Sequence, residues 1–210
     1  GQSAIALDGI QKELLRMMSM AEQNVKDSFD AVQDGTTRLL RTVTEREEYI
    51  DFLNKEISKY ISGVLAKETN PQTSRQISVL FKVCGNLERI GDHAMNICEY
   101  TRLMEEKGIS FSQAAREEIR SMQKISLEAM ENMKAIGESA GKDIGEIERM
   151  EQKIDDMTEQ YRANQMNRLH GGQCSDEACV LYSEMLTDFE RIGDHILNIG
   201  QEMGMGKVSA

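Results

Sequence analysis

The chain is poor in residues that interrupt helices. Its 210 residues include a single proline and no tryptophan, and only 5 % of the side chains are aromatic. Proline breaks helices, so its near absence favours long uninterrupted ones. The chain instead contains 14 methionines, and 29 % of its residues are charged. This composition indicates an all-α protein.

Other absences limit the classes of function that fit this chain. There is no apolar run long enough to cross a bilayer and no signal peptide, so we expect a cytoplasmic location and no direct insertion into a membrane. The net charge is −11, with 36 acidic and 25 basic residues and no basic cluster, which argues against nucleic-acid binding and favours cations as ligands. The four cysteines form no CxxC pair, so we expect free thiols in a reducing compartment.

One ten-residue segment occurs twice, as ERIGDHAMNI at 88–97 and ERIGDHILNI at 190–199, with eight identical positions. The copies lie 102 residues apart, about half the length of the chain. A period of this size indicates two copies of one structural unit. We therefore expect a first unit at residues 1–107 and a second at 108–210.

Apolar residues recur every three or four positions along most of the chain, as in packed helices. The breaks expected between the helices are Asp34–Gly35, a capping-box pattern at Thr42–Glu45, Asn70–Pro71, Gly108, Gly141 and Gly171–Gly172, with Ser175 as an N-cap. The second unit is expected to have helices at about 112–138, 143–169 and 175–204. The predicted fold is all-α, with two tandem three-helix bundles related by internal pseudo-symmetry.

Pairs of acidic residues four apart recur at matching places on the second and third helix of each unit. Residues with this spacing share a helix face, and the repulsion within such a pair is slightly destabilising unless a cation binds. The pairs are Glu47 and Asp51, Glu88 and Asp92, Glu151 and Asp155, and Glu190 and Asp194. A single pair of this kind ordinarily lies on a solvated helix face, but the recurrence of the pairs in both units favours metal binding.

A helical wheel places both pairs of a unit at about the same angle from the apolar seam. On antiparallel neighbouring helices they either both face the shared groove, so that four carboxylates meet, or both face away. Further candidate ligands on the third helices are His93, Asn96, Glu99, His195, Asn198 and Glu202. Either histidine could ligate a metal, and a role beside the ligands or on the surface fits equally well.

The chemistry of the ligands limits the metal. Carboxylate-dominated sites favour hard or borderline cations, so iron, zinc, manganese and magnesium are the candidates. Gly91 and Gly193 recur inside the acidic motif of both units. Glycine inside a helix costs about 1 kcal/mol relative to alanine, so we expect a close helix approach there.

The two ERIGDHxxN segments, each partnered by Glu-x-x-x-Asp on the preceding helix, resemble the PhoU family of helical regulators of bacterial phosphate uptake. The resemblance spans about residues 5–203. It implies two PhoU three-helix bundles and multinuclear clusters of divalent or trivalent metal ions held by the acidic motifs. It also implies a membrane-embedded phosphate transporter portion or subunit as partner, at the inner face of the plasma membrane, and leaves a homodimer open.

Two segments point to one branch of this family. Residues 5–17 (IALDGIQKELLRM) and 174–178 (CSDEA) resemble the cytoplasmic C-terminal domain of bacterial sodium/phosphate cotransporters. The free-standing regulator usually carries a Gln-Gln-Pro-Val-type stretch before its third helix, where this chain has TNPQT at 69–73. We therefore expect a cotransporter tail that acts through protein contacts. The alternative is a free-standing regulator of a phosphate ABC transporter and its sensor kinase.

Two other classes of function compete with regulation. A di-metal oxidase built in a helix bundle uses Glu-x-x-His, whereas the spacing here is Glu-x-x-x-Asp. The sequence also has no arrangement typical of a Ser/His/Asp or Cys/His nucleophile and no glycine-rich nucleotide loop, so we expect no enzymatic activity. The remaining alternative is a metal-free scaffold whose acidic stripes only keep it soluble.

Overall fold

The structure, a computed structural model, describes residues 2–138 and 143–208, and all regular secondary structure in these ranges is helical. The helices are α1 (Gln2–Asp34), α2 (Leu40–Lys67), α3 (Pro71–Lys107), α4 (Gln113–Glu138), α5 (Gly145–His170) and α6 (Asp176–Val208). The prediction of an all-α fold with two three-helix units is confirmed. The expected break at Gly141 lies outside the described residues. Across the described helices, none combines the length and apolarity needed to cross a membrane.

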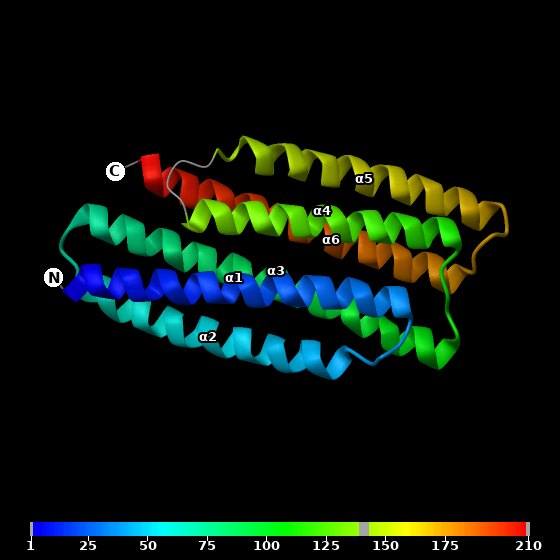
Figure 1. Cartoon of the computed structure of the whole chain (residues 1–210), viewed down its shortest axis with the longest axis horizontal. Helices are drawn as coiled ribbons and strands as arrows, with labels where there is room; N and C mark the ends of the chain where they lie inside the picture. Colours follow the sequence, from blue (N-terminus) through cyan, green and yellow to red (C-terminus); the bar gives the residue numbers. More distant parts are fainter. Residues whose placement is uncertain (1, 139–142, 209–210) are drawn as a thin grey trace.

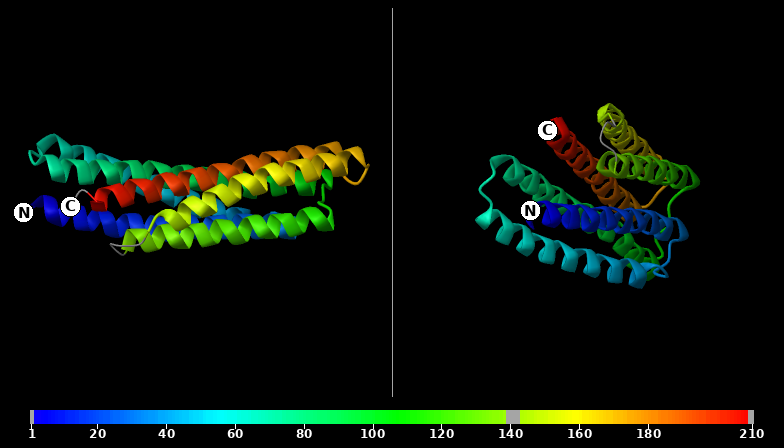
Figure 2. Two further views of the ribbon diagram at one scale, coloured as in Figure 1. Left: turned by 90° about the horizontal axis from the view of Figure 1, so that it is seen from above. Right: turned by 60° about the vertical axis from the view of Figure 1, so that its left-hand side comes forward.

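The two units lie side by side as two bundles of long helices (Figure 1). The contact between them is made by α1 against α4 and by α3 against α6. Helix α2 packs on α1 and α3, and α5 packs on α4 and α6, so α2 and α5 form the outer flanks (Figures 1 and 2). The main cluster of buried apolar side chains draws on all six helices, so the two units share one core.

Most of the predicted helix ends are confirmed. Helix α1 stops before Gly35, whose φ of 69° is a left-handed conformation that glycine adopts readily, and α3 stops in the same way at Gly108. Asn70 caps α3 by accepting hydrogen bonds from two backbone N–H groups, and Pro71 occupies the first helical turn. Ser175 caps α6, because its Oγ accepts from the backbone N–H of Ala178 at 3.1 Å.

The predicted capping box at Thr42–Glu45 is wrong. Helix α2 already begins at Leu40, so Thr42 lies inside it, and Thr44 Oγ1 donates to the Leu40 carbonyl at 2.7 Å. The reason is a tertiary contact that the local pattern does not reveal. Glu105, near the end of α3, accepts hydrogen bonds from both the backbone N–H and the hydroxyl of Thr37. These bonds hold the backbone just before Leu40, so that α2 begins about one turn earlier than the pattern predicts.

Each unit also contains an ion pair that is largely buried. In unit two, Arg168 of α5 binds Glu118 of α4, with Nη2 and Oε1 2.6 Å apart, and both side chains are nearly buried. Tyr182 of α6 donates to the same carboxylate. In unit one, the more exposed Arg46 binds Asp27 at 2.9 Å. These pairs tie the outer helices α5 and α2 to their bundles.

Candidate functional site

The four candidate acids of unit one meet in the groove between α2 and α3. We call Glu47, Asp51, Glu88 and Asp92 the unit-one acidic group. Burial, followed by the hydrogen-bonded and negatively charged Asp92, raises the pKa of Glu47 to about 9. Burial and the charges of Asp92 and Asp51 also raise the pKa of Glu88. Of the two arrangements that the helical wheel allowed, the structure therefore has the one in which both pairs face the shared groove.

Glu47 is the most deeply placed member of this group. Its Oε2 is buried and has no hydrogen-bond partner among the described residues. The space for this oxygen comes from Gly91 of α3, because a Cβ there would overlap Glu47 Oε2. A buried carboxylate oxygen without a partner is costly unless a proton or a cation accompanies it. The residues of this group therefore fit a metal ion.

Glu88 is held from the side by two further residues. Asn54 of α2 donates from Nδ2 to Glu88 Oε2 at 3.2 Å, and the Cys84 thiol donates to Asn54 Oδ1 at 2.9 Å. Burial, and then the charge of Glu88, raises the pKa of Cys84 to about 12, so the thiol keeps its proton at neutral pH. Sequence patterns gave no signal for Asn54, since asparagine on a helix face is ordinarily a surface residue.

The unit-two acidic group, Glu151, Asp155, Glu190 and Asp194, is arranged differently. One carboxylate oxygen from each of Glu151, Asp155 and Asp194 lies within 4.8 Å of the others, the one such trio of metal-ligating side chains in the described part of the chain. Glu190, although on the same helix as Asp194, is not part of the trio. Burial, and then Asp155, raises the pKa of Glu151 to about 7, and burial raises the pKa of Asp194.

The two motif glycines have different neighbours. A Cβ at Gly193 would lie 3.0 Å from Ile154 Cδ1, an apolar contact, whereas Gly91 faces a carboxylate. Ile154 stands three residues after Glu151, so the side chain that approaches Gly193 comes from nearly one turn further along its helix than the one that approaches Gly91. The expected close approach occurs at both glycines, but only Gly91 makes room for an acid.

The two histidines lie between the units, in the contact of α3 with α6. Their rings stack with centroids 5.6 Å apart and an angle of 21° between the planes. His93 Nδ1 is 2.8 Å from Asp188 Oδ1, and His195 Nδ1 is 3.0 Å from Asn86 Oδ1. Burial, and then the charge of His93, lowers the pKa of His195 to about 4.

The remaining candidates also lie apart from the two acidic groups. Asn96 donates to Asp188 and Asn198 donates to Asn86, so both take part in the same contact between the units. Glu202 is 3.9 Å from Lys82, and Glu99 is exposed. The sequence could have indicated Asn86 and Asp188, since each stands two residues before the glutamate of a repeated motif.

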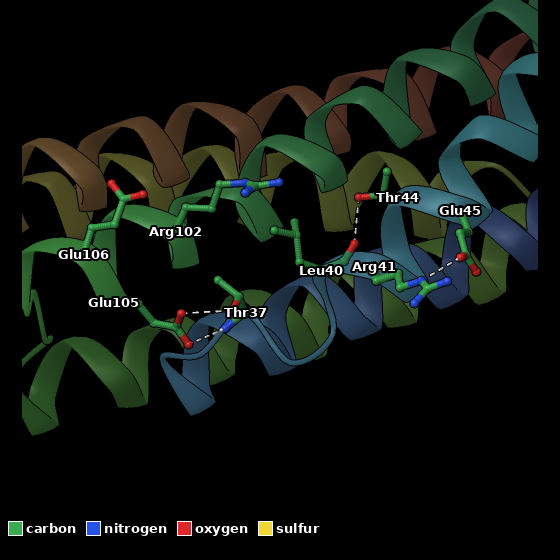
Figure 3. Close-up of a pocket in the computed structure, with 8 residues that line it drawn as sticks. All are labelled: Thr37, Leu40, Arg41, Thr44, Glu45, Arg102, Glu105 and Glu106. Atoms are coloured by element: carbon green, nitrogen blue, oxygen red, sulfur yellow. Dashed lines mark hydrogen bonds and ion pairs between the residues drawn. The ribbon is translucent and has the colours of Figure 1, made fainter.

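A separate hollow of about 490 Å³ lies where α2 begins and α3 ends (Figure 3). Its charged side chains are of both signs, and several are already paired. Glu105 accepts from Thr37, and Arg41 Nε is 3.1 Å from Glu45 Oε1. This surface shares no residue with either acidic group.

Comparison with known proteins decides the family. A model of the PhoU domain matches residues 14–101 and 116–203, one stretch in each unit. The chain belongs to the PhoU family. The phosphate-specific transport system accessory protein PhoU homolog 1 of Thermotoga maritima is 27 % identical over 197 residues, which cover 92 % of this chain and 84 % of that protein. The accessory protein PhoU of Escherichia coli is 30 % identical over 100 residues, covering 47 % of this chain and 41 % of its own.

Solved PhoU structures have the same fold. PhoU from Pseudomonas aeruginosa matches with a TM-score of 0.90 at 20 % identity, covering 99 % of both chains. The phosphate transport system regulatory protein PhoU from Streptococcus pneumoniae matches with a TM-score of 0.86 at 18 % identity, covering 99 % of this chain and 98 % of that one. As a PhoU-type protein, the chain is assigned to the regulation of phosphate transport.

Proposed function

We propose that this PhoU protein is a metal-binding accessory regulator of a phosphate transport system and that it acts through protein contacts rather than by catalysing a reaction. The observation that carries the metal-binding part is the meeting of paired carboxylates across α2 and α3 and across α5 and α6, with pKa values raised by burial and mutual repulsion. The regulatory part rests on the family and on relatives named as accessory proteins of phosphate-specific transport systems.

In each unit the proposed ligands come from two helices. In unit one, Glu47 of α2 lies beside Gly91, and Asp92 faces it from α3. In unit two, Glu151 of α5 belongs to the close trio, and Asp194 faces it from α6. When bound, a metal ion supplies the positive charge that offsets the repulsion among these carboxylates. The acids then hold α2 to α3 and α5 to α6 instead of pushing them apart.

Elemental analysis tests the metal-binding part. Protein purified without added metal is expected to carry iron, zinc, manganese or magnesium, and the variant Asp92→Ala/Asp194→Ala is expected to lose most of it while circular dichroism shows unchanged helicity. A double variant with full metal content would show that these carboxylates are not ligands. A wild-type protein that binds none of the four metals would favour a metal-free scaffold.

The identity of the transporter is tested separately. The relatives named above favour the phosphate-specific transport system, so the chain is expected to restore phosphate-dependent control of uptake in bacteria that lack their own accessory protein. Neutralising Glu88, Asp92, Glu190 and Asp194 together is expected to abolish that control. Uptake that stays unregulated with the wild-type chain well expressed would contradict the accessory role.

The second candidate is a cytoplasmic tail of a sodium/phosphate cotransporter, favoured by residues 5–17 and 174–178. In that case tethering would raise the effective concentration of a weak contact to roughly millimolar, and the chain would act only when joined to the membrane portion. Sodium-dependent phosphate uptake by a transporter fused to this chain is then expected to change when residues 5–203 are removed. Equal uptake with and without them rules this candidate out.

A further inference from the structure

A short chain of hydrogen bonds ends on one carboxylate of the unit-one acidic group. The Cys84 thiol donates to Asn54 Oδ1, and Asn54 Nδ2 donates to Glu88 Oε2. An asparagine side chain has one accepting end and one donating end, so a donor at Oδ1 turns the NH₂ group toward Glu88. Cys84 and Glu88 are one helical turn apart on α3, and Asn54 reaches both of them from α2.

This arrangement counters the repulsion that acts on Glu88. The side chain is only half-buried and has the charges of Asp51 and Asp92 beside it, so by itself it would turn toward solvent. The Asn54 amide holds Glu88 Oε2 in the groove by its hydrogen bond. A hydrogen bond of this kind to a charged group restricts the carboxylate to one orientation.

Unit two has the same acids without this support. Thr158 follows Glu151 by seven residues, as Asn54 follows Glu47, but its Oγ1 donates to the carbonyl of Ile154 in its own helix at 2.8 Å. Leu186 stands four residues before Glu190, in the place of Cys84. Glu190 is also the acid that stays outside the close trio of unit two.

We propose that Asn54, oriented by the Cys84 thiol, is a positioning residue that fixes Glu88 as a metal ligand in unit one, and that unit two has no equivalent. This inference rests on the proposed metal binding. It makes the two sites of the repeat unequal, with Glu88 a ligand of the unit-one site and Glu190 dispensable in unit two.

Mn²⁺ binding to the full chain tests the proposal, with the electron paramagnetic resonance signal of free Mn²⁺ as the readout. Unit one is isolated in the background Glu151→Gln/Asp155→Asn. In this background, Asn54→Ala is expected to weaken Mn²⁺ binding about 10- to 100-fold, the usual effect of removing a residue that orients a ligand. Cys84→Ala is expected to weaken binding less, and Cys84→Ser, which keeps a donor, is expected to restore it.

The matched control is Thr158→Ala in the background Glu47→Gln/Asp51→Asn, which isolates unit two. Mn²⁺ binding there is expected to be unchanged. Thermal unfolding of the metal-free variants separates an effect on the site from an effect on the fold. Asn54→Leu, which keeps the number and branching of the side-chain heavy atoms, replaces Asn54→Ala if the latter unfolds.

The possible results distinguish a failure of the positioning role from a failure of metal binding itself. If Asn54→Ala and Asn54→Leu bind Mn²⁺ as tightly as their background, or if Thr158→Ala weakens unit two equally, the positioning role is wrong while metal binding stands. If the unit-one background with Asn54 intact binds no Mn²⁺, the proposed metal site of unit one is itself wrong, and the positioning role is wrong with it.

Discussion

The two units carry nearly the same motif on α3 and α6 but place their acids in different surroundings. In unit one, the glycine of the motif faces Glu47, whose Oε2 is buried without a partner, and Glu88 is held by Asn54. In unit two, the corresponding glycine faces Ile154, and three acids gather without Glu190. A repeated motif therefore specifies which acids are present, while the side chains of the neighbouring helix determine their surroundings.

The largest expected difference between the units is in stability. Arg168→Ala leaves the nearly buried Glu118 carboxylate without its cation, and breaking such a pair costs about 3–5 kcal/mol of the free energy of unfolding. Arg46→Ala in unit one breaks a more exposed pair with Asp27, and the expected loss is about 1–2 kcal/mol. Urea unfolding of both variants measures the difference. Equal losses would show that the two ion pairs contribute alike despite their different burial.

The motif glycines provide the next comparison. Gly91→Ala is expected to displace the Glu47 carboxylate and to weaken metal binding in unit one by about tenfold or more, the scale expected when a ligand is misplaced. Gly193→Ala meets Ile154 instead, so the metal affinity of unit two is expected to fall much less, at a small cost in packing. Mn²⁺ titration of each variant, with the other unit disabled, checks both values. A larger loss for Gly193→Ala would reverse the assignment of the two glycines.

Much of this arrangement was predictable from the sequence. The period of 102 residues and the helical spacing predicted six helices in two units, and the Glu-x-x-x-Asp pairs predicted which acids share a face. The approach of Ile154 to Gly193, where unit one has Glu47 beside Gly91, was not predictable, because it depends on packing between helices. The roles of Asn54, Asn86 and Asp188 depend equally on contacts between helices that no local pattern encodes.

The raised pKa values predict that the stability of the metal-free protein depends on pH. The pKa of Glu47 is about 9 in the folded protein and near its ordinary value of 4.5 after unfolding. Between pH 4.5 and 9 the folded protein therefore keeps a proton on Glu47 that the unfolded chain releases. The stability of the metal-free protein is therefore expected to fall as the pH rises from about 4.5 to 9. Thermal unfolding in the presence of a chelator measures this fall.

Two substitutions test the cause of that pH dependence. Glu47→Gln is expected to flatten the pH dependence of stability between pH 7 and 9. The pKa of Glu151 is about 7, so Glu151→Gln is expected to flatten this dependence mainly below pH 7. If the two variants follow the same pH curve as the wild type, neither carboxyl retains its proton in the folded state.

The smallest expected effects concern helix caps. Ser175→Ala removes the hydroxyl that accepts from the Ala178 N–H and is expected to lower the free energy of unfolding by about 1 kcal/mol. Thr42→Ala is expected to leave it unchanged or raise it by a few tenths of a kcal/mol, since Thr42 lies inside α2 and alanine is the better helix former. A loss of about 1 kcal/mol for Thr42→Ala would restore the capping role that the sequence pattern suggested.

The most direct test of the account is the metal content of single-site variants of the full chain, measured by elemental analysis after identical purification. Each unit has its own acidic group, so Glu47→Gln is expected to remove the metal of unit one and leave unit two loaded, and Glu151→Gln is expected to do the opposite. The variant carrying both changes is expected to be empty. Loss of all metal from either single change would show one shared site, and full retention in the double variant would show that these carboxylates do not hold it.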